Sequence, residues 1–349
     1  MKRASQWFLG AMVLGLGVST GVQAQNKVNL QVVGNLGITT QHKELEVPFW
    51  TKELPAATKG VISASIKPWN EMGLKGNEVY RLLSQGVFDV GNTQLGFVAG
   101  DNAINDATDL AGVSPTIQTF HEVTDAFRPH IERYYEEKVK VKPLGMLSFQ
   151  AQVLFCRNEI KSLADLKGRK VRTSGASQAD FIGHFGGTGV NMPFGDVQQA
   201  LQTGVLDCAI TGTLGGYKAK WYDGAKFLYA MPINWGASLT AMNLKTWAKL
   251  DAATQKTVLQ EFRKLEKAVF DQNVRENDMG LACNTGGQCP EGTPAKMTLV
   301  QPSAADLELR RKALLETVLP RWAARCGTQC VKDWNDSVGK VVNLSAKAN

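Results

Sequence analysis

Two short groups of uncharged polar side chains are the residues of this chain best placed to bind a small molecule. Asn92, Thr93 and Gln94 form the first group, and Thr211 and Thr213 form the second. The segments that precede them are alike, YRLLSQGVFDVG in one case and QQALQTGVLDCAI in the other. Amides and hydroxyls donate and accept hydrogen bonds, so the chemistry that these groups favour is the binding of a small solute.

Each group stands at the end of a helix–glycine–strand unit. Gly86 and Gly204 come where a helix would stop, because glycine takes the left-handed cap without steric cost. In open α/β sheets, ligands bind just beyond the carboxyl ends of the strands. The two units therefore predict two similar lobes that close on one solute in a cleft between them. The alternative is that such units recur by chance, as they can in any α/β protein.

The composition is that of a globular protein with two domains. The chain has 349 residues, with 44% apolar and 20% charged residues, and this length exceeds what one core usually fills. The formal net charge is +7, but the lysines and arginines are scattered, which argues against a nucleic-acid partner. A weak positive field would favour anionic solutes at the level of encounter only.

The N-terminus has the pattern of a secretory signal peptide over residues 1–24. A basic start at Lys2 and Arg3 precedes a short apolar run, and the small-residue cleavage signal Val22-Gln23-Ala24 follows. A retained membrane anchor is the alternative, and a lipoprotein anchor is not expected because no cysteine follows the run. The expected location is the periplasm, with a soluble mature protein.

Six cysteines in an exported chain predict disulfides. The pairs Cys283–Cys289 and Cys326–Cys330 each flank a short turn-rich segment, and each bridge would add about 2 kcal/mol at most. A zinc site is the competing interpretation, but no CxxC pair or flanking histidine supports it, and no metal is expected. Cys156 and Cys208 fall in expected strands and are interpreted as buried thiols, with a bridge between them left open.

Strands and helices alternate along the chain, which indicates the α/β class. The expected strands cover residues 29–34, 61–66, 139–146, 150–155, 170–173, 228–231, 237–243 and 297–300. The expected helices cover residues 42–54, 76–84, 120–135, 162–166, 178–185, 251–277 and 303–325. The helix over 251–277 reaches roughly 40 Å, long enough to contact both lobes and support a hinge.

Two segments carry a resemblance to a known family. SLADLKGRKVR, from Ser162 to Arg172, is followed by MPFGDVQQALQTGVLD, from Met192 to Asp207. Together they resemble the signature of the DctP-type substrate-binding proteins of TRAP (tripartite ATP-independent periplasmic) transporters. TKELPAATKGVISASIKPWNEMG, from Thr51 to Gly73, resembles the first-lobe helix and strand of that family.

The resemblance implies a two-lobed periplasmic-binding-protein fold, with the ligand cleft between the lobes and a long helix spanning both. Residues 25–149 and about 236–275 would form the first lobe, and residues 150–235 and about 276–335 the second. The implied protein is a monomeric receptor without a cofactor. It captures a small organic acid and delivers it to membrane permease subunits driven by an ion gradient.

The resemblance also assigns site residues. The arginine that ends the KGxKxR strand, here Arg172, grips the ligand carboxylate in the family. A planar guanidinium suits this role because it forms two parallel hydrogen bonds to a carboxylate. Phe194 matches an aromatic residue that packs on the ligand, with plain core packing as the alternative. Gln152 falls where several members have a second arginine.

Further positions carry over from the same family. Thr211 replaces a common asparagine, and Asn35 and Gln94 match first-lobe positions that line the cleft. Trp69 and Trp235 sit on loops near strand ends, where each is as well explained by the core as by the pocket. A single arginine with neutral partners favours a monocarboxylate. An aromatic acid, a 2-oxo acid and a hydroxy acid all remain open.

An enzyme is the main rival class, and the sequence gives it little support. His42, His121, His130 and His184 stand outside any HExxH or HxxxH frame, and there is no GxSxG elbow. The glycine-rich run 186–189 follows a helix and suits a turn better than a dinucleotide site. The remaining alternative is a solute-binding protein of another importer or of a sensor, because these share one fold.

Overall fold

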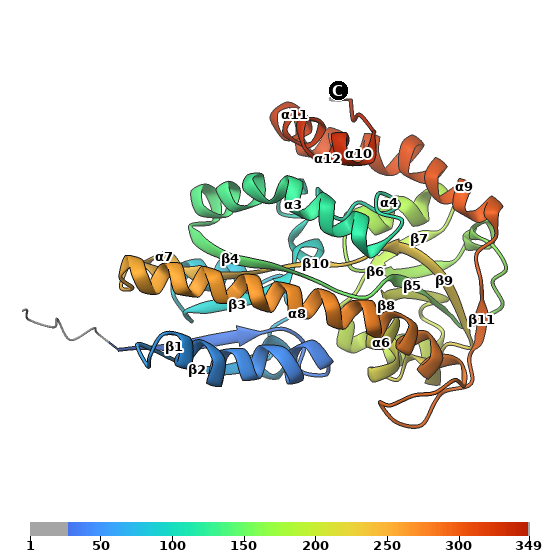
Figure 1. Cartoon of the computed structure of the whole chain (residues 1–349). Coiled ribbons are helices and arrows are strands. Elements are labelled where there is room, and N and C mark those ends of the chain that lie inside the picture. Colours follow the sequence, from blue (N-terminus) through green and yellow to red (C-terminus); the bar gives the residue numbers. More distant parts are fainter. Residues whose placement is uncertain (1–26, 348–349) are drawn as a thin grey trace, which may run out of the picture.

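The structure is a computed structural model that describes residues 27–347. The predicted signal peptide, residues 1–24, lies outside the described residues. The described chain forms two α/β lobes, each built on its own twisted sheet (Figure 1). The two-lobed α/β fold expected from the sequence is confirmed.

The first lobe is built on a five-stranded sheet in the order β2-β1-β3-β10-β4. Its strands are β1 (Val28–Gly34), β2 (Ile62–Pro68), β3 (Val90–Gln94), β4 (Val141–Ser148) and β10 (Ala237–Asn243). Strands β1, β2 and β3 are parallel, whereas β10 runs antiparallel to β3 and β4. Its helical segments are η1 (Gln41–Glu46), η2 (Phe49–Glu53), α1 (Leu54–Ala57), α2 (Val79–Gln85) and α3 (Ile117–Tyr134).

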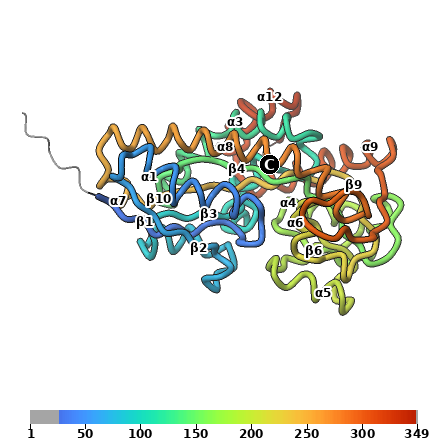
Figure 2. Tube along the Cα trace, turned by 60° about the horizontal axis from the view of Figure 1, so that its bottom comes forward, coloured from blue at the N-terminus to red at the C-terminus, as the bar shows by residue number. Residues whose placement is uncertain are grey.

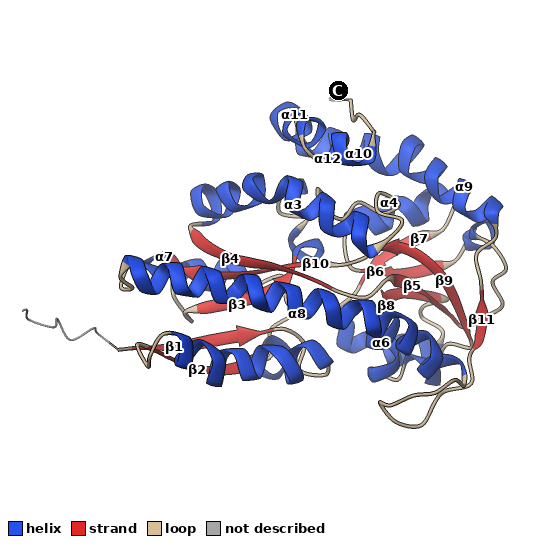
Figure 3. Cartoon of the chain, in the orientation of Figure 1, coloured by secondary structure: helices blue, strands red, loops and turns tan. Residues whose placement is uncertain are grey.

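The second lobe is built on a six-stranded sheet in the order β11-β9-β5-β8-β6-β7 (Figure 3). Its strands are β5 (Gln152–Cys156), β6 (Lys170–Thr173), β7 (Thr188–Asn191), β8 (Cys208–Gly212), β9 (Phe227–Asn234) and β11 (Thr298–Val300). Its helices are α4 (Ala176–His184), α5 (Val197–Thr203) and α6 (Thr213–Lys218). The repeated unit is present in both lobes, because Gly86 after α2 and Gly204 after α5 each have φ of 80°.

All six cysteines are paired in the structure. The expected bridges Cys283–Cys289 and Cys326–Cys330 are both present. Cys156 and Cys208 are also bonded, so the bridge that the sequence left open is present and they are not buried thiols. The physical reason is register: the two residues are direct partners in the antiparallel pair of β5 and β8, which brings their side chains together in the core.

The chain crosses between the lobes at two points. The first crossing lies between Ser148, the end of β4, and Gln152, the start of β5. The second lies between Asn234, the end of β9, and Ala237, the start of β10. Both crossings are only a few residues long, so they hold the lobes close together on one side.

A single long helix, α8 (Ala252–Thr285), runs along both lobes (Figures 1 and 2). At 1.5 Å per residue its 34 residues extend about 50 Å. Asp251 caps its start by accepting a hydrogen bond from the Thr254 N–H, and Gly286, with φ of 90°, ends it. The sequence predicted its start correctly but placed its end two turns early, at residue 277.

The two halves of α8 belong to different lobes. Val258, Phe262 and Val269 in the first half are buried in a cluster with residues of β1 and β4. In the second half, Gly280 lies directly against α6, where an added Cβ would come 2.3 Å from the Leu214 nitrogen. The helix is therefore fastened to each lobe by a different part of its length.

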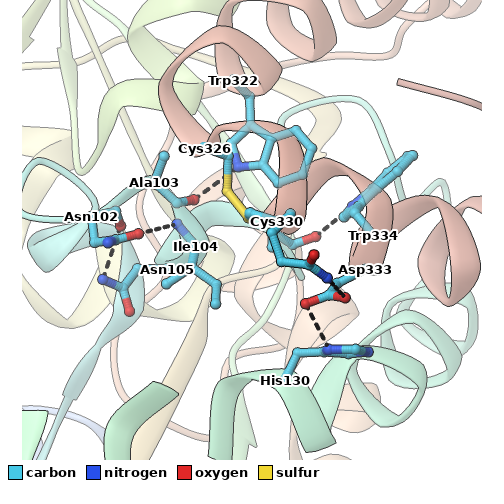
Figure 4. Close-up of a disulfide and its surroundings, with 12 residues drawn as sticks. Asn102, Ala103, Ile104, Asn105, His130, Trp322, Cys326, Cys330, Asp333 and Trp334 are labelled. Carbon is cyan, nitrogen blue, oxygen red and sulfur yellow. Dashed lines mark hydrogen bonds and ion pairs between the residues drawn. A yellow bond between two sulfur atoms is a disulfide. The ribbon is translucent and has the colours of Figure 1, made fainter. Parts of the chain in front are cut away.

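The C-terminal helices form a layer that contacts both lobes. They are α9 (Ala304–Ala313), η10 (Leu314–Val318), α10 (Leu319–Cys326), α11 (Thr328–Asp336) and α12 (Val338–Val342). The Trp322 and Trp334 indoles donate to the carbonyls of Ala103 and Ala107 in the first lobe, at 2.8 and 2.9 Å. Figure 4 shows these contacts beside the Cys326–Cys330 disulfide.

On its other side, this C-terminal layer is attached to the second lobe. Arg325 Nη2 donates to Asp180 Oδ2 on α4 at 2.7 Å. The sequence had assigned residues up to about 335 to the second lobe alone. The layer instead joins both lobes, because its tryptophans are spaced to reach the first lobe while its arginines reach α4.

Candidate functional site

A cavity lies between the two lobes, with about 580 Å³ of space free of protein atoms, part of it open to solvent. The first lobe contributes Leu36, Thr39, Thr40, Gln41, Gln94 and Phe97 to its lining, and Phe149 and Gln150 come from the first crossing. The second lobe contributes Gln152, Arg172, Phe194, Thr211, Gly212, Leu214, Gly215 and Lys218. The lining is mostly neutral and polar or apolar, with two basic side chains.

Five residues singled out from the sequence line this cavity together: Arg172, Phe194, Thr211, Gln152 and Gln94. They come from β6, the 3-10 turn η8 (Phe194–Asp196), β8, β5 and β3. These elements place them at the strand ends that face the other lobe. The structure therefore brings together residues that are more than 100 positions apart in the chain.

Arg172 is the most deeply buried charged group of the cavity, with 2% of its surface exposed. Its Nε donates to the Met192 carbonyl at 3.0 Å, and its Nη1 donates to the Ile210 carbonyl at 2.8 Å. Its guanidinium carbon lies 5.9 Å from the centre of the Trp221 ring. These contacts fix the guanidinium in one orientation and leave further N–H groups for a ligand.

The charge of Arg172 has no partner of opposite sign in the described part of the chain. No carboxylate comes within ion-pair distance, and burial alone lowers the pKa of Arg172 to about 10. The guanidinium therefore remains protonated at neutral pH. A buried cation with no counter-charge is unfavourable, so this position is suited to an anionic ligand.

Lys218, the second basic residue of the lining, already has an anionic partner. Its Nζ forms an ion pair with Glu291, in the loop that follows α8. This loop is held in place by the Cys283–Cys289 disulfide and by a hydrogen bond from the Tyr217 hydroxyl to the Thr293 carbonyl at 2.8 Å. The positive charge available to a ligand is therefore that of Arg172.

The floor of the cavity is connected to the long helix. Gln150 Nε2 donates to Asn273 Oδ1 at 2.9 Å and to Glu276 Oε2 at 2.5 Å, both on α8. Thr40 of the first lobe also forms a hydrogen bond with Glu276. Burial raises the pKa of Glu276 above its usual range. Glu276 thus connects Thr40 of the first lobe and Gln150 of the first crossing to α8.

Three phenylalanines supply the aromatic part of the lining, one from each structural region. Phe97 belongs to the first lobe, Phe149 to the first crossing and Phe194 to the second lobe. Phe194 is half-buried and packs against Trp221, with ring centres 5.3 Å apart. A ligand between the lobes would therefore have aromatic surface on several sides.

Asn35, Trp69 and Trp235 are not part of the lining. Asn35 accepts a hydrogen bond from the Leu36 N–H through its own Oδ1, at 2.7 Å. The Trp235 indole is buried in the core and donates to the Ser114 carbonyl at 3.0 Å. Core packing, one of the two alternatives for Trp235, is what the structure shows.

Trp69 lies near the cavity without entering it. Its ring packs edge to face on Phe97, and it lines a second opening that shares Leu36 and Phe194 with the cavity. Trp69 therefore lines this second opening and not the cavity, and its side chain is buried in the core of the first lobe.

Only one member of each polar group found in the sequence reaches the cavity. Gln94 and Thr211 line it, whereas Asn92 donates to Thr240 Oγ1 at 2.7 Å and Thr213 donates to the Asn277 carbonyl at 2.9 Å. Alternation along β3 directs the Thr93 side chain away from the face of Gln94. Asn92 shares the face of Gln94 but is bonded to β10, and Thr213 already belongs to helix α6.

The sequence did not single out the first-lobe residues Thr39, Thr40 and Gln41 as site residues. They stand just before the segment over residues 42–54, which was expected only to be a helix. No metal site replaces the cleft as a candidate, because residues 27–347 contain no group of three or more His, Cys, Asp or Glu side chains arranged to hold a metal ion. None of the helices within that range is long and apolar enough to cross a membrane.

Solved structures show the same fold. One is DctP7, a Bordetella pertussis extracytoplasmic solute receptor binding pyroglutamic acid, with a TM-score of 0.78 and 18% identity over 90% of this chain and 99% of that one. Another is a TRAP periplasmic solute-binding protein from Desulfovibrio salexigens with bound orotic acid. It has a TM-score of 0.81 and 16% identity, and the match covers 90% of this chain and 100% of that one. A third is a TRAP periplasmic solute-binding protein from Rhodoferax ferrireducens with bound malonate. It has a TM-score of 0.78 and 16% identity, and the match covers 90% of this chain and 98% of that one.

The comparison with curated protein sequences found no match. The model of the DctP family, described as bacterial extracellular solute-binding protein, family 7, matches residues 37–314. This match covers most of the chain and confirms the resemblance found in the sequence. The chain belongs to the DctP family of extracytoplasmic solute receptors and is a binding protein, not an enzyme.

Proposed function

We propose that this protein is the periplasmic receptor of a TRAP transporter and that it captures a small monocarboxylate through Arg172. The observation that carries the proposal is the buried guanidinium that faces the cavity without a carboxylate partner in the described chain. Binding of an anion supplies the missing counter-charge and two charge-assisted hydrogen bonds. The receptor would then deliver its ligand to the membrane permease subunits.

The charges of the cleft favour one carboxylate over two. Lys218 is neutralised by Glu291, and Gln152 falls at the position where several members of the family have a second arginine. Pyroglutamic acid and orotic acid, bound by the DctP7 and Desulfovibrio receptors, each carry one carboxyl group. Malonate, bound by the Rhodoferax receptor, carries two, so dicarboxylates belong in any screen of ligands.

Closure of the lobes would complete the site. Arg172, Phe194 and Thr211 belong to the second lobe, and Gln94 belongs to the first. A small acid can touch both sets only when the lobes are together, so it stabilises the closed state by its higher affinity for that state. The hinge would lie at the two crossings, with α8 bending between its two halves.

A thermal-shift screen of organic acids, followed by calorimetry, tests the proposal. A ligand at 100 times its dissociation constant should stabilise the protein by roughly 2.7 kcal/mol. Arg172→Ala should then weaken binding by about 3 kcal/mol or more while the variant remains folded. Arg169→Ala is the matched control, because Arg169 donates to the carbonyls of Asn158 and Glu159 instead of lining the cavity. Near-normal affinity in Arg172→Ala would exclude the carboxylate grip.

A further inference from the structure

The cavity contains a buried hydrogen-bond acceptor that no group in the described chain satisfies. Gln41, at the start of η1, lines the cavity and has 2% of its surface exposed. Its Nε2 donates to Glu46 Oε1 at 3.1 Å, but its Oε1 is buried and has no hydrogen-bond partner among residues 27–347. Leaving such an oxygen unpaired is unfavourable, so its presence at a binding cavity points to a ligand group.

The orientation of the Gln41 amide follows from the chemistry of Glu46. The Glu46 side chain is almost fully buried, and its Oε2 also accepts a hydrogen bond from the Asn35 N–H at 2.9 Å. The same oxygen lies 3.1 Å from His42 Nδ1. Both oxygens of the Glu46 side chain thus accept hydrogen bonds from their neighbours. The side of the Gln41 amide that faces Glu46 must therefore be the NH₂ group, which directs the carbonyl oxygen to the other side.

We propose that Gln41 Oε1 accepts a hydrogen bond from the ligand, and that the receptor selects carboxylates that also carry an N–H or O–H donor. The inference rests on the proposed function, since it assumes that Arg172 holds the carboxylate. A lactam acid or a hydroxy acid meets both conditions, whereas a simple alkanoic or arylacetic acid meets only one. A ligand that lacks the donor would exclude water from Gln41 Oε1 and leave that oxygen without a hydrogen bond, which weakens binding.

The two groups also lie on different lobes. Gln41 belongs to the first lobe and Arg172 to the second, and both line the same cavity. A ligand that satisfies both would therefore connect the lobes through polar contacts at its two functional groups. The selection for a donor and the stabilisation of the closed state would then have the same origin.

Matched pairs of acids test the inference on the wild-type protein. Suitable pairs are pyroglutamate with 5-oxotetrahydrofuran-2-carboxylate, in which a ring oxygen replaces the N–H, and mandelate with phenylacetate, which lacks the hydroxyl. For a pair that binds, calorimetry should show the donor-bearing acid binding about 10- to 100-fold tighter. Equal affinities within every pair that binds would overturn the inference.

Variants locate the preference at Gln41. Gln41→Met keeps the length of the side chain but removes the acceptor, so the affinity ratio within a pair should fall to about 1. Gln41→Asn, which withdraws the oxygen by one methylene, should lower the ratio as well and serves if the methionine variant does not fold. Gln31→Met, at an exposed position of β1 in the same lobe, is the control and should keep the wild-type ratio.

Glu46→Gln tests the positioning role. It replaces one of the two acceptor oxygens of residue 46 by an NH₂ donor, so Gln41 loses its fixed orientation and the ratio within a pair should fall, although residue 46 is not part of the lining. A ratio that stays at its wild-type value in Gln41→Met would overturn the inference while leaving the carboxylate grip standing. If no carboxylate binds at all, the proposed function fails, and the inference fails with it.

Discussion

At the scale of single residues, the buried charged groups at and near the cleft are held in place by hydrogen bonds. Arg172 is held by two backbone carbonyls, and Glu276 is held by Gln150 and Thr40. Each of these groups would be costly to bury without such partners. The same physics makes conservative substitutions at these positions informative.

Replacement of Arg172 by lysine should reduce ligand affinity strongly, although the positive charge is kept. An ammonium group cannot reproduce the planar fork that binds a carboxylate, and it loses the fixed bonds to the carbonyls of Met192 and Ile210. We expect calorimetry on Arg172→Lys to give at least about 10-fold weaker binding. Arg169→Lys should bind normally, and a lysine variant at Arg172 with wild-type affinity would show that charge alone matters.

Asp106 should make the stability of the protein depend on pH. Burial raises the pKa of Asp106 from 3.8 to about 7, and its Oδ2 has no hydrogen-bond partner in the described chain. Because the folded pKa lies above the unfolded value, this group stabilises the fold fully below about pH 4. That contribution is lost as the pH rises towards 7.

Denaturant unfolding of Asp106→Asn and of the wild type, measured from pH 4 to pH 8, checks this expectation. The amide resembles the neutral acid, so the two proteins should have similar unfolding free energies at pH 4. The variant should become progressively more stable than the wild type up to about pH 7 and then stay so. A difference that does not change with pH would contradict the assignment of a raised pKa to Asp106.

At the scale of elements, two contacts decide how the second lobe is assembled. One is the Cys156–Cys208 disulfide between β5 and β8, the two strands that carry Gln152 and Thr211 into the cavity. The other is the close approach of α8 to α6 at Gly280. Both can be tested without changing a residue of the lining.

Removal of the Cys156–Cys208 disulfide should cost more stability than removal of either other disulfide. It closes a loop of 52 residues, whereas the other two span 6 and 4 residues. In the chain-entropy model this corresponds to about 2–4 kcal/mol. Urea unfolding of Cys156→Ser/Cys208→Ser, compared with Cys326→Ser/Cys330→Ser, measures the difference. Peptide mapping without reductant should first recover all three pairs, and any other pairing would refute this arrangement.

Gly280→Ala should destabilise the protein by about 1–3 kcal/mol. The added methyl group would lie 2.3 Å from the Leu214 nitrogen and 2.5 Å from Thr213 Oγ1, so α8 would have to move away from α6. Gly100→Ala is the control, because an added Cβ there meets no atom within 4 Å. Equal unfolding midpoints for the two variants would show that the contact at Gly280 is not tight in solution.

The sequence predicted most elements of this fold, and the reasons for its failures are physical. The strands over 170–173 and 237–243 have the predicted bounds, and a glycine, Gly168 or Gly236, marks the turn before each. Strand β7 (Thr188–Asn191) was missed since its glycines suggested only a turn. The expected last helix stops at residue 325, and the helices after Gly327 were not predicted, because the glycine with φ of 81° interrupts the helical pattern there.

The site was predicted in part for similar reasons. Motifs local to the second lobe identified Arg172 and Phe194, and the repeated unit identified Gln94 and Thr211. Gln41 was missed because its significance depends on Glu46 and on the position of the other lobe, and the sequence TTQHKELE carries no signal of either. Trp235 is a loop aromatic in the sequence, which does not distinguish pocket from core, and its indole donates to a backbone carbonyl in the core.

At the scale of the whole molecule, the lobes should move together when a carboxylate binds. We expect X-ray scattering to show a decrease of roughly 1 Å in the radius of gyration, as for other hinge closures. Tryptophan emission should change too, because Trp221 lies beside both Arg172 and Phe194. Trp221→Phe should remove most of that change while keeping the scattering response. A tight ligand that alters neither signal would exclude closure and favour a preformed pocket.

The connections that join the two lobes along one side affect how fast a bound solute can leave. Two short crossings, α8 and the C-terminal layer all join the lobes, whereas the opening lined by Trp69 and Phe194 contains no residue of α8. If the cavity is reached when the lobes separate, a solute has to leave by the same movement. Its residence time is then limited by how often the lobes separate, however strong the individual bonds are. A membrane partner that pulled the lobes apart would therefore speed up unloading without competing for any atom of the cargo.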